Sequence, residues 1–402
     1  MTVAIHREAL AIHGGTPVRS SMLPYARQSI SESDIKAVVD VLRSDWLTTG
    51  PKVAEFEEAF ASFVGARFAV SFSSGTAALH AATYAAGLGA GDEAITSPMT
   101  FVATANCVLY QGARPVFVDV CEDTLNIDTD RLAACLRPNT RAVLPVDYAG
   151  HPADLDVIME LAGRSGLTVI EDASHALGSE YYARRTGSVV HMTTFSFHPV
   201  KHIATGEGGM VTTDRAEFAQ KLRCFRNHGI SRNSRERAMA GDWHYDAAVP
   251  GFNYRLGDVA CALGLEQLKR IDENLIRRRK IAAMYTSAFR SIQGLFLPVV
   301  RQDVTPAWHL YPIRLDLSRI TANRAQIFHA LQAENIGVNV HYIPVHFHSY
   351  YRERFGHQPG EFPVAEDAYE RLISLPMFHG MTDKDVSDVI EAVTKVMEHF
   401  AK

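Results

Sequence analysis

Short apolar runs alternate with helical patterns between about residues 67 and 214, and this alternation restricts the fold more than any other feature. Val, Ile, Thr and Phe dominate the runs, which include residues 67–73, 94–97, 115–120, 142–150, 167–172, 193–197 and 210–214. Helical spacing separates several of them, as in residues 76–88 and 155–166. Buried strands joined by helices are typical of an α/β domain with a mostly parallel central sheet flanked by helices.

The pattern changes after about residue 262. A long helical pattern covers residues 263–289, mixed short elements follow, and the last helix carries on one face Val386, Val389, Ile390, Val393 and Met397. We therefore predict a large domain with an N-terminal arm over residues 1–270 and a smaller C-terminal α/β domain over residues 271–402. The basic run Arg277 to Lys280 is expected to form a solvated helix face.

Charge and cysteine content limit the function classes. The 402 residues carry a net charge of -5, so no broad basic surface is expected and nucleic acid is not predicted as a partner. The five cysteines are scattered and never spaced as CxxC, which disfavours a disulfide framework and a zinc knuckle and favours a reducing cytoplasm. No apolar run reaches about 18 residues, and residues 1–15 lack a signal-peptide core, so no membrane partner is expected.

The first candidate strand end is the stretch from Ser73 to Thr76, where a strand passes into a helix. Free amides at a helix N-terminus favour an anion such as phosphate, and Gly75 permits close approach. A turn that only caps the helix is the structural alternative. The spacing does not match GxGxxG or GxxxxGK[ST], which disfavours dinucleotide-binding and P-loop sites.

Two further strand ends carry ionisable side chains. Asp172 follows an apolar strand, and a carboxylate at that depth needs a partner, either in a structural ion pair or in a protonated heterocycle. Ser196 ends another strand, and Lys201 lies just beyond it before the glycines of residues 206–209. The alternative to a ligand-binding role for Lys201 is an ordinary surface lysine.

Together the three strand ends supply an anion site, a carboxylate and an amine. In open α/β sheets such ends meet at the ligand-binding edge. These groups match the needs of pyridoxal 5'-phosphate (PLP), which forms a Schiff base with a lysine and has its pyridine nitrogen held protonated by an acidic residue. The set therefore predicts PLP as cofactor.

The chain resembles the fold-type I, PLP-dependent nucleotide-sugar aminotransferases of the DegT family. The resemblance extends over nearly the whole chain through LTTGP, SSGTAALH, SPMTFVATAN, EDASHALGS, SFHPVKHIATGEGG and GFNYRLGDVACALGLEQL. It implies that Lys201 forms the Schiff base, that Asp172 pairs with the pyridine nitrogen and that Phe101 stacks on the ring. It also implies that the cofactor phosphate is bound by Gly75, Thr76 and Ser196. His175 is implied to face the phenolic oxygen of the ring.

Family dimers share their active sites. The resemblance therefore implies a homodimer in which Asn253 of one subunit reaches the cofactor phosphate of the other. Many members have glutamine in place of His175 and asparagine in place of Ser73. A related branch of sugar dehydratases has histidine in place of the lysine, so Lys201 groups this chain with the aminotransferases.

Residues 146–156, 172–182, 309–315 and 340–356 look most like the members that act at C4 in the pseudaminic acid pathway. This likeness implies a UDP-linked 4-keto-6-deoxy sugar, UDP-2-acetamido-2,6-dideoxy-β-L-arabino-hex-4-ulose, as substrate and L-glutamate as amino donor. The alternatives are C4 aminotransferases for sugars of the bacillosamine, perosamine or 4-amino-arabinose type.

Segments that the family brings toward the pocket contain polar and aromatic residues that are candidate substrate contacts: Tyr25, His228, Arg255, His309, His341 and Tyr342. A structural role is the alternative for each of them. The histidines of HFHSYY lack accompanying acidic or cysteine ligands, so no metal site is predicted.

Two other function classes remain as alternatives. A non-catalytic PLP-fold or sugar-nucleotide binding protein would also keep the fold, although no appended DNA-binding module is visible in the sequence. A nicotinamide-dependent sugar oxidoreductase is disfavoured by the missing GxGxxG and its downstream acid.

Overall fold

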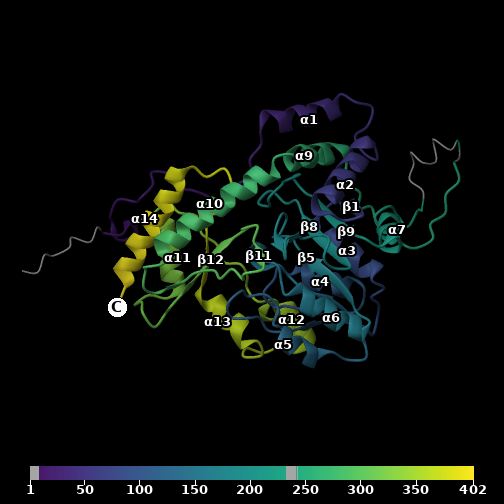
Figure 1. The fold of residues 1–402 in the computed structure, drawn as a ribbon. Helices are drawn as coiled ribbons and strands as arrows, with labels where there is room; N and C mark the ends of the chain where they lie inside the picture. The colour runs from purple at the N-terminus through teal and green to yellow at the C-terminus, as the bar shows by residue number, and fades with distance from the viewer. Residues whose placement is uncertain (1–8, 232–240, 242) are drawn as a thin grey trace, which may run out of the picture.

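The computed structural model describes residues 9–231, 241 and 243–402 (Figure 1). Residues 1–8, which belong to the stretch tested for a signal peptide, lie outside the described part. The helices are α1 (Glu32–Leu42), α2 (Pro51–Val64), α3 (Gly75–Ala85), α4 (Ala103–Tyr110), α5 (Thr129–Leu132), α6 (Leu155–Ser165), α7 (Ala216–Phe225), α9 (Asp258–Leu268), α10 (Ile271–Phe289), α11 (Arg324–Ala333), α12 (Ser349–Phe355), α13 (Pro363–Arg371) and α14 (Asp383–Phe400).

Thirteen strands are assigned within these residues, in three sheets. The strands are β1 (Phe68–Phe72), β2 (Glu93–Thr96), β3 (Arg114–Phe117), β4 (Thr140–Leu144), β5 (Thr168–Asp172), β6 (Glu180–Tyr181), β7 (Arg184–Arg185), β8 (Met192–Ser196), β9 (Gly209–Thr213), β10 (Leu295–Phe296), β11 (Val304–Thr305), β12 (Tyr311–Leu315) and β13 (Leu372–Leu375).

The central sheet has seven strands in the order β1-β9-β8-β5-β4-β2-β3. Strands β8, β5, β4, β2 and β3 pair in parallel, and β9 is antiparallel to both β1 and β8. The predicted α/β class with a mostly parallel sheet is confirmed. Because β1, β5 and β8 run in the same direction, the residues that follow them meet at one edge of the sheet.

Helices cover both faces of the central sheet, because successive strand residues point to opposite faces. Val70, Ala142 and Ile170 pack into the core formed with α3, α4 and α7. Their neighbours Val143 and Val169 pack with α6 on the other face, where α2 and α9 also lie. This layered arrangement explains why the strand runs are apolar throughout.

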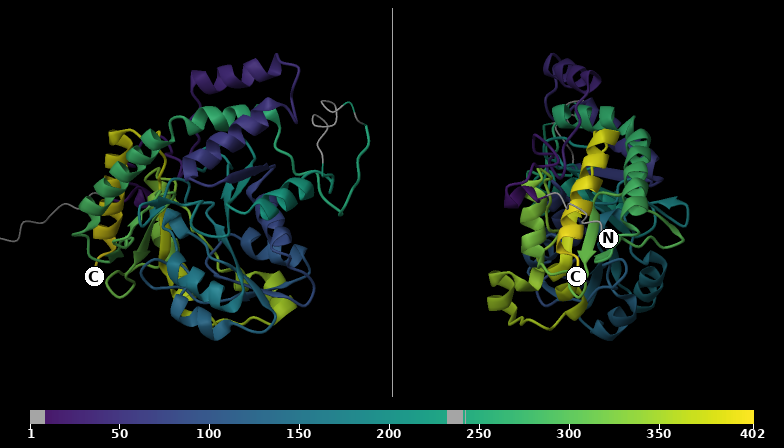
Figure 2. Two further views of the ribbon diagram at one scale, coloured as in Figure 1. Left: turned by 45° about the vertical axis from the view of Figure 1, so that its right-hand side comes forward. Right: turned by 90° about the vertical axis from the view of Figure 1, so that its left-hand side faces the viewer.

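A second core lies beside this layered unit (Figure 2). It is formed by α10, α11, α14 and the antiparallel sheet β10-β12-β13. Strand β11 instead pairs with β6, so residues 304–305 belong to the third sheet, β11-β6-β7. The division near residue 270 stays a prediction, and the separate core formed mainly by residues 281–397 supports it.

The N-terminal arm belongs to the second core. Leu10 and Leu23 are buried in that core. The fully buried carboxylate of Glu334 accepts the Ala11 and Val18 amides, each at 2.9 Å, and its Oε2 also lies 3.1 Å from the Nζ atom of Lys395. These contacts fix the start of the chain against its last third.

Two details differ from the expectations. The pattern over residues 263–289 contains two helices, α9 and α10, with a break at residues 269–270. Arg278 is not on a solvated face: it is 1% exposed, and its Nη1 atom donates to the carbonyls of Trp308, His309 and Met377. Arg277 and Lys280 do reach the surface, where both pair with Asp383.

Candidate active site

A cavity of about 530 Å³ lies at the carboxyl edge of the central sheet. Eleven of the fourteen residues predicted from the sequence line it: Tyr25, Gly75, Thr76, Phe101, Asp172, His175, Ser196, Lys201, His309, His341 and Tyr342. They come from both ends of the chain and from the central sheet, so the fold brings together segments more than 300 residues apart.

The N-terminus of α3 opens into this cavity. Ser74 caps the helix by accepting the Ala77 amide at 3.1 Å, and Gly75 and Thr76 are the first two helical residues. The first amides of a helix have no partner within the helix, so they remain available to a ligand. Ser196 lies next to Gly75, because a Cβ atom built on Gly75 would be 3.1 Å from the Ser196 Oγ atom. Amides and a hydroxyl thus converge on one anion-binding corner.

Asp172 ends β5 and is 5% exposed. Its Oδ2 atom accepts the Thr104 hydroxyl at 2.6 Å, and its Oδ1 atom accepts the Ser174 hydroxyl at 2.6 Å and the Ser174 amide at 3.2 Å. These donors satisfy both carboxylate oxygens and fix the orientation of the side chain at the cavity.

Lys201 lies in the loop between β8 and β9 and lines the same cavity. Burial lowers the pKa of its amine to about 8, and the nearby charge of Asp172 partly offsets this effect. A substantial fraction of the amine is therefore neutral near physiological pH, as a nucleophile or a base requires.

Three histidines pack beside the lysine. The His175 and His309 rings have centroids 4.3 Å apart, and the His202 ring lies 5.6 Å from His309. Burial, with a smaller effect from Lys201, lowers the pKa of His175 well below its usual value. Its ring is therefore neutral, and its Nε2 atom lies 2.8 Å from the Tyr342 hydroxyl.

The opposite wall comes from the arm and from residues 339–342. The Tyr25 ring lies 5.5 Å from the His341 ring, and the Nδ1 atom of His341 is 3.0 Å from the Ser374 hydroxyl. Phe101 is 57% exposed and lies 6.1 Å from Tyr342, which leaves its ring face open to a flat ligand.

Three predicted residues lie elsewhere. Asn253 is exposed and pairs with Asn227 in a β-bridge, and His228 is exposed with its amide donating to Phe252. Arg255 donates to the Asn227 side chain at 2.8 Å. None of the three lines the first cavity.

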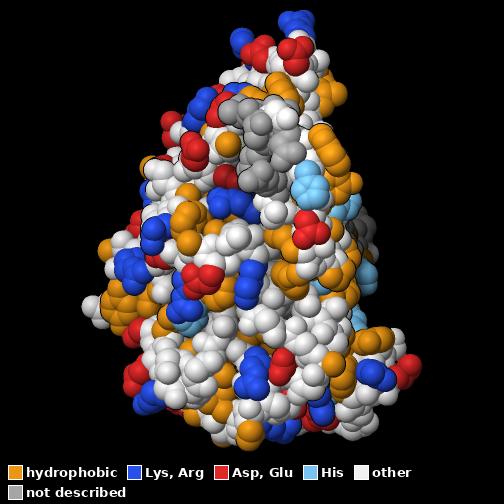
Figure 3. Space-filling view, turned by 90° about the vertical axis from the view of Figure 1, so that its right-hand side faces the viewer, with side chains coloured by type: hydrophobic (Ala, Val, Ile, Leu, Met, Phe, Trp, Pro, Cys, Tyr) orange, Lys and Arg blue, Asp and Glu red, His pale blue; other side chains and the backbone are white. Residues whose placement is uncertain are grey.

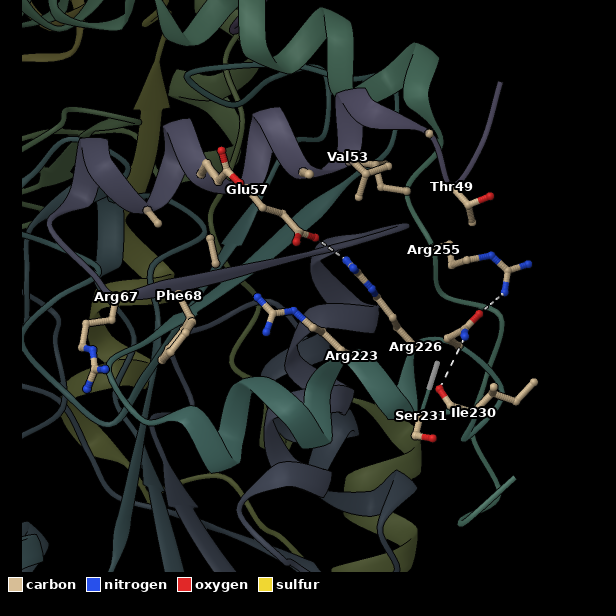
Figure 4. Close-up of a pocket in the computed structure, with 17 residues that line it drawn as sticks. Thr49, Val53, Glu57, Arg67, Phe68, Arg223, Arg226, Ile230, Ser231 and Arg255 are labelled. Atoms are coloured by element: carbon tan, nitrogen blue, oxygen red, sulfur yellow. Dashed lines mark hydrogen bonds and ion pairs between the residues drawn. The ribbon is translucent and has the colours of Figure 1, made fainter. Parts of the chain in front are cut away.

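Arg255 lines a second cavity, of about 470 Å³, between α2 and the end of α7 (Figure 4). Arg67, Arg223 and Arg226 also line this cavity, and Arg226 is paired there with Glu57. Arg226, Asn253 and Arg255 therefore do not face the first cavity of their own chain.

Several lining residues had no prediction. Ser174 could have been found from its position two residues after Asp172, where its hydroxyl can return to the carboxylate. Asn339 carries no such local signal, because its neighbours in the cavity are distant in sequence. The same holds for Thr104, which does not line the cavity but donates to Asp172.

Across residues 9–231, 241 and 243–402, no group of three or more His, Cys, Asp or Glu side chains could hold a metal ion. Over the same residues, no helix is long and apolar enough to cross a membrane.

Known proteins resemble this chain over nearly its whole length. SpsC of Bacillus subtilis, a spore coat polysaccharide biosynthesis protein, is 46% identical over 382 residues, covering 94% of this chain and 98% of that protein. The structure of Helicobacter pylori PseC, an aminotransferase involved in the biosynthesis of pseudoaminic acid, is 33% identical with a TM-score of 0.88 and covers 94% of this chain and 100% of that one.

The PLP-form of Spr1654 from Streptococcus pneumoniae is 30% identical, with a TM-score of 0.88, and covers 94% of this chain and 99% of that one. The sequence model of the DegT/DnrJ/EryC1/StrS aminotransferase family matches residues 28–394. The expected family and the fold-type I architecture are thus confirmed. This chain belongs to the DegT/DnrJ/EryC1/StrS aminotransferase family.

Proposed function

We propose that this protein is a PLP-dependent aminotransferase that places an amino group on C4 of a UDP-linked 4-keto-6-deoxy sugar, with L-glutamate as donor. The observation that carries the proposal is the convergence of Lys201, Asp172 and the N-terminus of α3 on one cavity. Family membership and the PLP-form of a structural neighbour support the choice of cofactor.

The cavity residues fit PLP. The amides of Gly75 and Thr76 and the Ser196 hydroxyl would hold its phosphate, and the Asp172 carboxylate would hold its ring nitrogen. The open face of Phe101 would cover the ring, and His175 would face the phenolic oxygen. When bound covalently through Lys201, PLP supplies an electron sink for the carbanion formed at a substrate carbon.

The chain's own groups move and hold protons. Once its amine is free, Lys201, with a pKa of about 8, would take a proton from the donor's α carbon and hold it for return, because a partly neutral amine can act as a base. Asp172 would hold the ring nitrogen of PLP in its protonated form. The neutral His175 ring, held by Tyr342, accepts or donates a hydrogen bond without adding a charge.

The donor's carboxylates need cationic partners, and the described residues that line the first cavity include no arginine. Arg255 is the arginine predicted from the sequence, and it lies on the segment that presents Asn253 and His228 away from the cavity. A neighbouring subunit that contributes Arg255 and Asn253 would complete the site, which supports a homodimer with shared sites.

Exposed apolar side chains also support dimerisation. Several lie on residues 30–47 and 243–252: Ile30, Ile35, Leu42, Trp46, Leu47, Trp243, Tyr245 and Phe252. Figure 3 shows hydrophobic side chains at the surface on this side of the molecule, interspersed with basic and acidic ones. The five unpaired cysteines support a cytoplasmic location.

The pseudaminic acid pathway is proposed as the setting, with UDP-2-acetamido-2,6-dideoxy-β-L-arabino-hex-4-ulose as substrate. The likeness to PseC supports this choice. The alternative is another nucleotide-linked 4-keto-6-deoxy sugar, because SpsC is at least as similar in sequence and its name gives no substrate.

Product analysis with a panel of UDP-, GDP- and dTDP-linked 4-keto-6-deoxy sugars tests the substrate. Turnover restricted to the UDP L-arabino ketosugar supports the proposal, whereas preference for a D-configured or thymidine-linked sugar contradicts it. The reaction class is tested separately with L-glutamate alone, by measuring 2-oxoglutarate release. Lys201→Ala should abolish both that release and the visible absorbance of bound cofactor. Lys221→Ala should abolish neither, because the Lys221 amine donates to the Ala85 carbonyl and does not line the cavity.

A further inference from the structure

Two buried acidic side chains, Asp147 and Glu171, lie behind Asp172 on the opposite face of the central sheet. Each has no measurable exposure. Val146 and Asp172 form a parallel bridge and both line the cavity. Because side chains alternate along a strand, Asp147 and Glu171 point away from the cavity, into the layer that contains α6.

Each carboxyl group has one oxygen with a donor and one without. The Oδ1 atom of Asp147 accepts the Ala153 amide at 3.0 Å, and the Oε2 atom of Glu171 accepts the Thr193 hydroxyl at 2.7 Å. The Oδ2 atom of Asp147 and the Oε1 atom of Glu171 receive no N–H or O–H donor from the described residues. The parallel bridge between Val146 and Asp172 makes Asp147 and Glu171 diagonal neighbours on one face of adjacent strands, within reach of each other, and the charge of Glu171 raises the pKa of Asp147.

Two ionised carboxylates cannot hydrogen-bond to each other, because neither carries a donor. A proton on one of them supplies the donor and satisfies both remaining oxygens. No cation compensates a second charge: within the described part of the chain, neither side chain takes part in an ion pair. Two uncompensated charges side by side in a dry interior would be very costly.

The electrostatic environment points the same way. Burial, and then the neighbouring Glu171 carboxylate, raise the pKa of Asp147 well above its usual value. Burial also raises the pKa of Glu171, although the hydroxyl of Thr193 opposes this effect. The charge of Asp172 adds to the increase for both groups. In contrast to the pair, Asp172 receives hydrogen bonds on both of its oxygens, three in all.

We propose that Asp147 and Glu171 share a single proton at neutral pH and act as positioning residues for Asp172. The shared proton ties the end of β4 to β5, immediately beside Asp172. It also leaves one negative charge, not two, on the far face of the sheet. The remaining negative charge stabilises a positively charged group in the cavity, such as the protonated form of the bound cofactor. This electrostatic effect rests on the proposed function.

Variants that change the number of negative charges distinguish a pair that shares one proton from a pair that is fully ionised. Asp147→Asn and Glu171→Gln each replace the shared proton by an amide N–H, so each retains one negative charge. The double variant D147N/E171Q retains none. If the wild-type pair were fully ionised, each single variant would already remove a charge.

Infrared spectroscopy of the full-length protein tests the proton directly. The expected result is a carbonyl band of a protonated carboxylic acid at neutral pH that disappears in both D147N and E171Q. Asp119→Asn is the matched control: Asp119 is buried but accepts the amides of Val120, Val364 and Ala365, so its replacement should leave the band. Absence of the band from the wild type overturns the proposal. Should one single variant fail to fold, the other gives the same test.

The effect on the cavity is read from the pH at which the cofactor-bound protein changes its visible absorbance. The single variants should leave this apparent pKa unchanged. The double variant should lower it by about 0.5–1, because removing a charge roughly 10 Å away destabilises a cation. An equal shift in a single variant, or no shift in the double variant, overturns the positioning role. If the protein bound no PLP, the infrared measurement would still show whether Asp147 and Glu171 share a proton. A failure of the proposed function can therefore be told apart from a failure of this proposal.

Discussion

Ser196 and Gly75 lie so close together that a Cβ atom on Gly75 would be 2.9 Å from the Ser196 Cβ atom. Ser196 cannot easily move away, because it ends β8 and pairs with Gly209 on β9. Glycine at position 75 is therefore what lets the N-terminus of α3 approach the strand end at the anion-binding corner.

Gly75→Ala should lower the free energy of unfolding by about 1–3 kcal/mol, because the added methyl overpacks this contact. It should also weaken phosphate binding by displacing the amides of α3. Urea denaturation and PLP titration measure the two effects. Gly163→Ala is the matched control: no atom lies within 4 Å of its added methyl, and alanine stabilises a helix interior by up to about 1 kcal/mol. Equal effects of the two substitutions would contradict the close-contact explanation.

Lys201→Met should stabilise the cofactor-free protein by about 3 kcal/mol at pH 7, where burial of the charged amine opposes folding. The folded amine loses its proton at about pH 8 and the unfolded one near pH 10.5. Wild-type stability therefore rises with pH between these values, and the advantage of the variant disappears.

Chemical denaturation at pH 7 and pH 10 measures this difference. Lys36→Met is the control, because Lys36 is exposed and forms a surface ion pair with Asp40. An advantage for K201M that grew with pH would show that the amine is not held in a low-pKa environment.

Asp172→Asn should slow the proton-transfer step by about a hundredfold or more, since an unprotonated ring is a poorer electron sink. Cofactor affinity should fall much less, because the phosphate contacts remain. Removing the charge should also lower the pKa of Lys201 below about 8, since Asp172 raises it. Single-turnover absorbance measurements and PLP titration separate the two quantities. A loss of affinity equal to the loss of rate would contradict the assigned role.

Mixing two inactive variants tests the shared site. If Asn253 of one subunit serves the cavity of the other, a mixture of Lys201→Ala and Asn253→Asp subunits should regain about a quarter of wild-type activity, because half of randomly formed dimers contain one intact site of two. Subunits should be mixed after partial denaturation and assayed for 2-oxoglutarate release. No recovery, with dimers re-formed, would place Asn253 outside the neighbouring site.

The strand-end residues were predictable from the sequence. Gly75, Asp172 and Ser196 each follow an apolar strand run, and the carboxyl ends of parallel strands meet by geometry. The resemblance added Phe101, His175 and the arm residue Tyr25, for which no local pattern predicts a place in the cavity.

Other features depend on contacts that no local pattern encodes. Arg278 lies in a basic run typical of a solvated face, yet it is buried because three backbone carbonyls from residues 308, 309 and 377 surround its guanidinium. Thr104 reaches Asp172 across 68 positions. Asn253 and Arg255 were predicted near the pocket, and the fold of one chain places them elsewhere.

The attachment of the arm to Glu334 bears on how this protein should be trimmed for expression. The family match begins at residue 28, but Leu10 and Leu23 fill the second core and Tyr25 forms part of the cavity wall. A recombinant fragment cut at the family boundary would leave Glu334 buried without the Ala11 and Val18 amides, and would remove one side of the pocket. Such a fragment would be a poor substitute for the full chain in crystallisation or ligand screening.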